Sequence, residues 1–91
     1  MIFKHSTTCN ISHMVLSRLE RNWKASDAGS VKPYFLDLRA HRSVSNGVAS
    51  FFDVEHESPQ LLIIRDGKPI HVSSHMEIDF DQIRRVAGAQ L

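Results

Sequence analysis

The apolar run Leu61-Leu62-Ile63-Ile64, followed one residue later by Asp66-Gly67, constrains the fold more than any other part of the chain. A continuous apolar run of this length is expected of a strand that is buried on both faces of its sheet. Asp-Gly is a strong signal for a tight hairpin turn. The segment from Pro69 to Ser73 is then the return strand, with proline at its start. The sequence therefore predicts a hairpin whose first strand lies inside a sheet.

Before this hairpin, the chain alternates between strand and helix patterns. Met1 to Lys4 is a short apolar start that predicts a strand. Apolar residues then recur at helical spacing and predict one buried helix face; they are Ile11, Val15, Leu19 and Trp23, with Met14 and Leu16 beside them. The stretch 26–30 (Ser-Asp-Ala-Gly-Ser) breaks this pattern. Val31 to Leu38 is a strand candidate whose paired part is expected to start after Pro33.

Two further helices complete the pattern. The second is predicted from about Val44, with Ser43 as its cap, and its apolar face comprises Val44, Val48, Phe51 and Phe52. The last begins near Asp79 and buries Phe80, Ile83 and Val86. The order is β-α-β-α-β-β-α, in which the first β-α-β implies a parallel pair with a right-handed crossover. This is the minimal thioredoxin or glutaredoxin order, an α/β fold with a mixed four-stranded sheet and a short first strand.

Length and charge narrow the class of protein. A chain of 91 residues fits one domain spanning 1–91. The formal net charge of +1 includes no basic excess that would indicate nucleic-acid binding. No apolar stretch is long enough to span a bilayer, so no membrane association is expected. The N-terminus lacks an apolar signal region, which predicts a cytoplasmic protein.

Cys9 is the single cysteine of the chain, which excludes an internal disulfide. It lies just after the first predicted strand and just before the first predicted helix. A helix N-terminus favours negative charge, and therefore the reactive thiolate. Ser12 stands where a C-x-x-C protein has its second cysteine; its hydroxyl could donate a hydrogen bond to the thiolate but cannot resolve a mixed disulfide. Chemistry at Cys9 would need an external thiol, and the alternative is a small loop residue without a role.

The residues before the buried strand are a second candidate part of the site. Pro59 at a strand entrance is often only an edge or turn residue. The functional alternative is a cis-proline beside the thiol that exposes backbone groups of Ser58 to a bound peptide or thiol. His56, three residues earlier, could approach Cys9 and stabilise its thiolate as a protonated imidazole. The alternative for His56 is a solvated side chain.

A metal site is the third possibility. His5, Cys9 and His13 are spaced four residues apart, and Zn²⁺ takes such ligands. His5 is expected on the end of the strand, however, so helical spacing does not extend across Cys9. No closed set of four ligands is visible, and no metal site is predicted.

Four blocks of the chain, in order, resemble the monothiol bacilliredoxin family (YtxJ-type proteins of the bacillithiol system). The resemblance runs from about Ile2 to His75, and the blocks are Phe3–Ser12, Tyr34–Leu38, Arg42–Asn46 and His56–Gln60. It implies a thioredoxin-like fold and a redox role with bacillithiol, a low-molecular-weight thiol, as co-substrate and with no bound prosthetic group. The family's active cysteine maps onto Cys9 and its proline loop onto Ser58-Pro59. The residues expected to stabilise the thiolate or bind substrate are Thr8, Asn10, Ser12, His56, Ser58 and Pro59.

Two departures from the family pattern stand out. The family usually has proline after the cysteine, where this chain has Asn10. It also usually carries a further segment before the first strand, so an N-terminal segment is expected to be lacking or the first strand to be short. Neither departure removes the nucleophile.

Three functions follow as hypotheses. The first is a thiol–disulfide oxidoreductase in which Cys9 takes bacillithiol from mixed disulfides on proteins, so that its partners are bacillithiolated proteins and a small thiol. The second is an iron–sulfur cluster or metal carrier of the monothiol glutaredoxin type, with Cys9 as a ligand. The third is a non-catalytic binding module that uses the surface around Pro59.

Overall fold

The computed structural model describes residues 1–23 and 31–89, so the predicted break at 26–30 lies outside the described part. The described strands form one four-stranded sheet in the order β2-β1-β3-β4. Their bounds are β1 Ile2–His5, β2 Tyr34–Asp37, β3 Gln60–Arg65 and β4 Lys68–Ser74. β1 runs parallel to β2 and antiparallel to β3, and β3 and β4 form the predicted hairpin. The predicted mixed sheet and its element order are confirmed.

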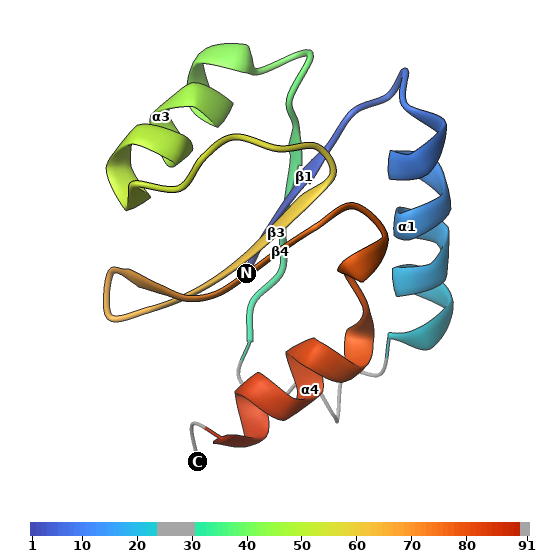
Figure 1. Cartoon of the computed structure of the whole chain (residues 1–91), viewed down its shortest axis with the longest axis vertical. Coiled ribbons are helices and arrows are strands. Elements are labelled where there is room, and N and C mark those ends of the chain that lie inside the picture. The colour runs from blue at the N-terminus through green and yellow to red at the C-terminus, as the bar shows by residue number, and fades with distance from the viewer. Residues whose placement is uncertain (24–30, 90–91) are drawn as a thin grey trace.

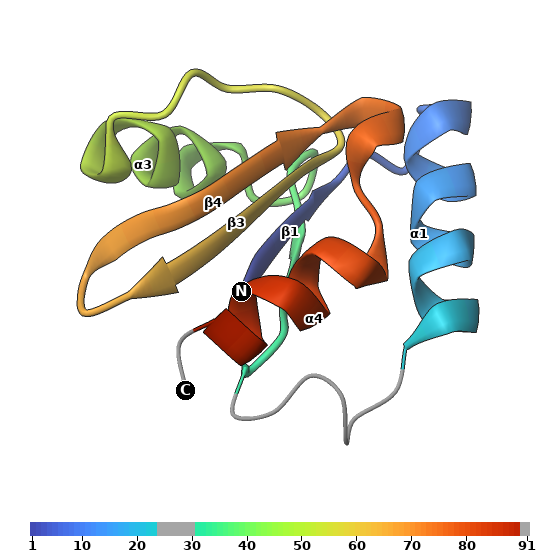
Figure 2. The same cartoon turned by 60° about the horizontal axis from the view of Figure 1, so that its bottom comes forward.

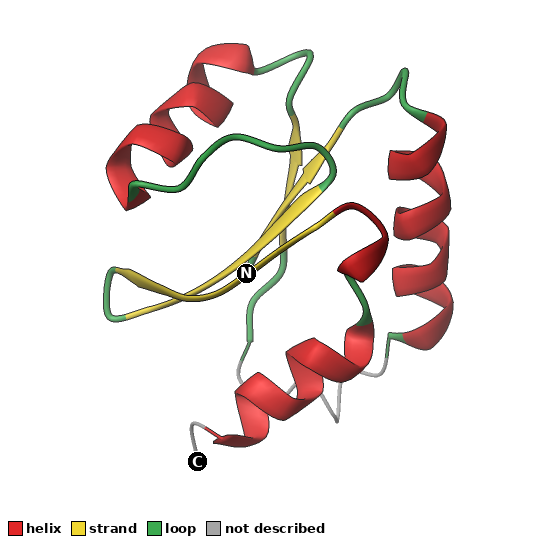
Figure 3. Cartoon of the chain, in the orientation of Figure 1, coloured by secondary structure: helices red, strands yellow, loops and turns green. Residues whose placement is uncertain are grey.

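Helices lie on both sides of this sheet, with α1 and α3 on opposite sides (Figure 1, Figure 3). The helices are α1 Asn10–Asn22, α3 Arg42–Phe52 and α4 Phe80–Ala89, with a short 3-10 helix η1 at His75–Glu77. η1 had no counterpart in the sequence pattern. None of the helices in the described ranges is long and apolar enough to cross a membrane.

The main core lies between the sheet and the pair α1 and α4 (Figure 2). Its buried members come from β1, α1, β3 and residues 78–83: Phe3, Val15, Leu19, Leu61, Ile63, Ile78, Phe80 and Ile83. Trp23 and Val86 pack against this cluster, as the periodicity predicts, whereas Ile11 is 44% exposed and does not belong to the buried face. The buried stripe of α1 therefore runs through Ser12, Val15 and Leu19, and Ile11 lies outside it.

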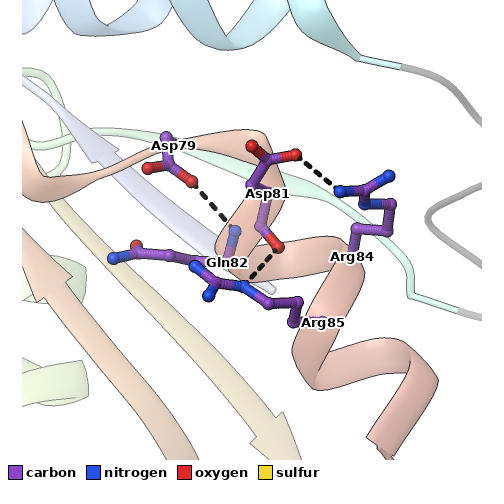
Figure 4. Close-up of polar contacts among 5 residues, drawn as sticks. All are labelled: Asp79, Asp81, Gln82, Arg84 and Arg85. Carbon is purple, nitrogen blue, oxygen red and sulfur yellow. Dashed lines mark hydrogen bonds and ion pairs between the residues drawn. The ribbon is translucent and has the colours of Figure 1, made fainter.

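The beginning of α4 is held by side chain to backbone hydrogen bonds (Figure 4). A carboxylate oxygen of Asp79 accepts the backbone N–H of Gln82 at 2.9 Å, which satisfies a donor that has no partner inside the helix. Asp81 pairs with Arg84 at 3.0 Å, and its carbonyl accepts a 3.4 Å bond from Nε of Arg85. The predicted start of the last helix near Asp79 is thus confirmed.

The side of the sheet beneath α3 is packed differently. Ser45 is the buried residue of α3, while Val44 and Phe51, predicted for its apolar face, are 53% and 78% exposed. The helix begins at Arg42 with His41 at the cap position and no side-chain cap bond, so the prediction of Ser43 as the cap is wrong. β2 is the edge of the sheet on this half of the molecule, and its aromatic residues Tyr34 and Phe35 are more than half exposed.

Candidate functional site

Cys9 occupies the N-cap position of α1, at the end of a short loop that follows β1. Its backbone is extended, with φ −104° and ψ 119°, and its side chain is free and half-buried. Its N–H donates to the carbonyl of Ser6 at 3.2 Å, and its carbonyl accepts the N–H of His13 at 3.1 Å. No side chain caps α1, and its first turn contains no acidic residue. The thiol therefore lies at a helix terminus whose dipole favours an anion.

Ser12 holds the loop that leads to the thiol. The Ser12 hydroxyl, fully buried, accepts the backbone N–H of Ser6 at 3.0 Å and shares a 2.7 Å hydrogen bond with Nδ1 of His5. These two partners place the hydroxyl between the loop backbone and β1, and donation from Ser12 to a Cys9 thiolate stays a prediction.

Two histidines flank the loop. The ring of His5 is 3% exposed and lies 4.8 Å from that of His13, in an edge-to-face arrangement. Burial lowers the pKa of His5, the neighbouring His13 lowers it further, and Asp37 opposes the shift. His13 is exposed, and its Nε2 donates to the carbonyl of Thr7 at 2.8 Å. In the described residues no group of three His, Cys, Asp or Glu side chains is arranged to hold a metal ion.

His56 is tied to a buried lysine. Lys4 is fully buried on the central strand β1, where its Nζ donates to the carbonyl of Ser45 at 3.1 Å and to Nδ1 of His56 at 3.3 Å. Burial lowers the pKa of Lys4. Burial also lowers the pKa of His56, followed by the charges of Lys4 and Arg42, while Glu57 opposes them.

His56 is exposed, and its Nδ1 lies 3.3 Å from the Lys4 ammonium, which disfavours a second positive charge on the ring. Its approach to Cys9 as a protonated imidazole stays a prediction. Lys4 thereby joins β1 to both α3 and the loop before β3. The residue offered no such signal in the sequence, where a lysine on a short strand is ordinarily exposed.

The Ser58-Pro59 peptide bond is cis, as the functional interpretation of this loop expected. Pro59 is buried, and its carbonyl accepts the N–H of His75 at 3.0 Å. Lys4 pairs with Gln60 across the sheet, so the β1–β3 register places Pro59 level with the end of β1. Both views show the loop before β3 arriving beside the segment that leads from β1 into α1 (Figure 1, Figure 2). The hydroxyl oxygen of Ser58 is buried there without a hydrogen-bond partner among the described residues.

Thr8 and Asn10, on either side of Cys9, are both exposed. The Thr8 hydroxyl accepts a 2.9 Å bond from Nη1 of Arg39, which lies in the loop after β2. Sequence reasoning missed Arg39, because the two residues are 31 positions apart and nothing in the local sequence joins them. The carboxyl ends of β1 and β2 thus carry Cys9 on one loop and a guanidinium on the next.

Comparison with known proteins identifies a family and a fold for the chain. Residues 1–83 match the family model of monothiol bacilliredoxin BrxC. A solved structure provisionally described as an oxidoreductase with a thioredoxin fold superposes with a TM-score of 0.76 at 27% sequence identity. The superposition covers 99% of this chain and 75% of that one.

Proposed function

The chain belongs to the monothiol bacilliredoxin family, and from this premise we propose that its Cys9 thiolate removes bacillithiol from mixed disulfides on other proteins. The observation that carries the proposal is the position of Cys9. The only cysteine of the chain is partly exposed at the uncapped N-terminus of α1, in a chain of a thiol-oxidoreductase family.

The reaction is one exchange of sulfur partners. The Cys9 thiolate attacks the bacillithiol sulfur of the mixed disulfide, a Cys9–bacillithiol disulfide forms, and the target protein leaves as a thiolate. One disulfide replaces another, so there is no net oxidation or reduction and no bound redox group is required. Since Ser12 stands in place of a resolving cysteine, a second bacillithiol or a reductase must then attack the adduct and release Cys9.

The residues around Cys9 have separate parts in this proposal. Backbone groups at the start of α1, next to Thr8 and Asn10, hold the incoming thiol, and the backbone of Ser58 beside Pro59 pairs with it from the other side. Ser12 positions the loop through Ser6 and His5. His56 influences the site indirectly, through its hydrogen bond with Lys4.

Intact-protein mass spectrometry tests the proposal. Wild type and Cys9→Ser are incubated with bacillithiol disulfide and, in parallel, with glutathione disulfide; a bacillithiolated protein is then offered to the reduced wild type. We expect one bacillithiol adduct on wild type, formed faster than the glutathione adduct, no adduct on Cys9→Ser, and loss of bacillithiol from the target. An accessible thiol that takes up neither thiol, or an adduct that persists in Cys9→Ser, would refute it.

A further inference from the structure

The loops after β1 and β2 leave the sheet toward opposite sides. β1 and β2 are parallel neighbours, and β1 leads into α1 while β2 leads into α3 on the other side of the sheet (Figure 1, Figure 3). In open α/β sheets, ligands bind outside the carboxyl ends of strands at the point where successive connections diverge in this way. Cys9 ends one of these loops and Arg39 lies on the other.

The backbone at Arg39 is fixed by Asp37. An oxygen of the Asp37 carboxylate accepts the N–H of Arg39 at 3.1 Å and that of Ala40 at 3.2 Å. The carbonyl of Asp37 accepts the N–H of His41 at 3.0 Å, and the N–H of Leu38 donates to the carbonyl of His5. These bonds hold the turn against the end of β1, from which the Arg39 side chain reaches the hydroxyl of Thr8 at 2.9 Å.

The guanidinium of Arg39 has capacity left for an anion. In the part of the chain that the structure describes, none of the ion pairs includes Arg39, and its bond to Thr8 uses one of five N–H donors. The first turns of α1 and α3, which start at this edge, contain no acidic residue. Arg42 adds a second exposed cation at the start of α3. Arg39 and Arg42 therefore bring two cations to this edge, beside the carboxylate of Asp37, and the anchored guanidinium of Arg39 can bind a further carboxylate through two N–H groups.

We propose that Arg39 is a specificity-determining residue that binds a carboxylate of the small thiol disulfide that reacts with Cys9. The inference rests on the proposed function and names the feature of the substrate that this site selects, a negatively charged carboxylate near the sulfur. In the step itself, the Cys9 thiolate forms a bond to one sulfur of the disulfide, the old S–S bond breaks, and the other half leaves as a thiolate. Arg39 takes no proton or electron; it orients the anion.

Three small disulfides distinguish this role from general reactivity. The probes are dithiodipropionate, with two carboxylates; bis(2-hydroxyethyl) disulfide, which is neutral; and cystamine, which is cationic. Adduct formation on Cys9 is followed by mass for wild type, Arg39→Gln, Arg39→Lys and the matched control Arg85→Gln. Arg85 lies on α4, away from Cys9, so its variant removes the same charge without touching the site.

We expect Arg39→Gln to lower the ratio of the anionic to the neutral rate about two- to fivefold, the range for one exposed charge pair. Arg85→Gln should leave the ratio unchanged, and Arg39→Lys should restore part of it because the charge without the planar fork remains. The preference of wild type should disappear at about 1 M salt, where charges are screened beyond about 3 Å.

An unchanged ratio in Arg39→Gln, with normal reaction of all three probes, would overturn the role of Arg39 and leave the proposed function standing. A lack of reaction of wild-type Cys9 with every probe would instead count against the proposed function. A drop of equal size in Arg85→Gln would mean that net charge rather than the position of Arg39 sets the preference, which also overturns the inference.

Discussion

Replacing Ser12 by alanine should destabilise the protein strongly, although it removes one oxygen atom. Ser12 is fully buried, and its oxygen is the partner of both the Ser6 N–H and Nδ1 of His5, which are themselves nearly inaccessible to water. A buried polar group that loses its partner costs about 1–3 kcal/mol. Two such groups, less about 0.5 kcal/mol for the better helix propensity of alanine, put the loss at about 2–5 kcal/mol.

This loss is a large share of the 5–14 kcal/mol or so expected for a chain of this length. At about 4–8 °C per kcal/mol, the midpoint of thermal unfolding should fall by at least about 8 °C. Urea unfolding followed by circular dichroism measures the free energy, and Ser17→Ala is the matched control. Ser17 lies on the exposed side of the same helix, so its substitution should change stability by no more than about 0.5 kcal/mol.

The same variant separates two roles for Ser12. If Ser12 positions the loop, stability falls and Cys9 alkylation changes only as the loop loosens. If the hydroxyl instead served the thiolate directly, Ser12→Ala would unfold like wild type while Cys9 reacted more slowly with iodoacetamide. That second result would refute the reasoning from the His5 and Ser6 contacts.

Further predictions concern the titrating groups beneath and beside the site. The pKa values of His5 and His56 are lowered in the folded state, so as the pH falls below about 6.5 the unfolded chain takes up protons before the folded one does. Stability should therefore fall from pH 7.5 to pH 5.5, and equal urea midpoints at the two pH values would contradict this. The pKa of Lys4 is also lowered in the folded state, so stability should rise with pH between the folded pKa of Lys4 and 10.5. Lys4→Met should abolish that rise relative to wild type in the same urea series. Asp37→Asn keeps an oxygen that can accept the turn's N–H groups but loses the charge that supports protonation of His5; NMR titration should show the pKa of His5 lowered further, and an unchanged value would exclude the Asp37 contribution.

The element order could be predicted because each element has a local signature. The apolar run 61–64 with Asp66-Gly67 predicts the β3–β4 hairpin, and four-residue spacing predicts α1. Pro33 correctly indicated that the paired part of β2 begins after it. These patterns depend on neighbours within a few positions, which is why they could be read directly.

The polar contacts of the site could not be predicted in the same way. The bond between Lys4 and His56 joins residues 52 positions apart, and that between Arg39 and Thr8 joins residues 31 apart. Lysine and arginine are ordinarily surface residues, so residue type alone did not predict that Lys4 is buried or that Arg39 is bonded to Thr8. Ser12 stood out in the sequence by its place three residues after Cys9, but its contacts with Ser6 and His5 depend on where β1 ends relative to α1.

The edge strand β2 bears on how the purified protein behaves in storage. Outer backbone groups of a sheet edge can pair with another chain, and exposed aromatic residues add to the attraction. β2 presents Tyr34 and Phe35 at such an edge, limited on one side by Pro33, which cannot donate a backbone bond. Slow self-association in concentrated stocks should begin along this strand, and Tyr34→Lys should lengthen shelf life while leaving the chemistry of Cys9 intact.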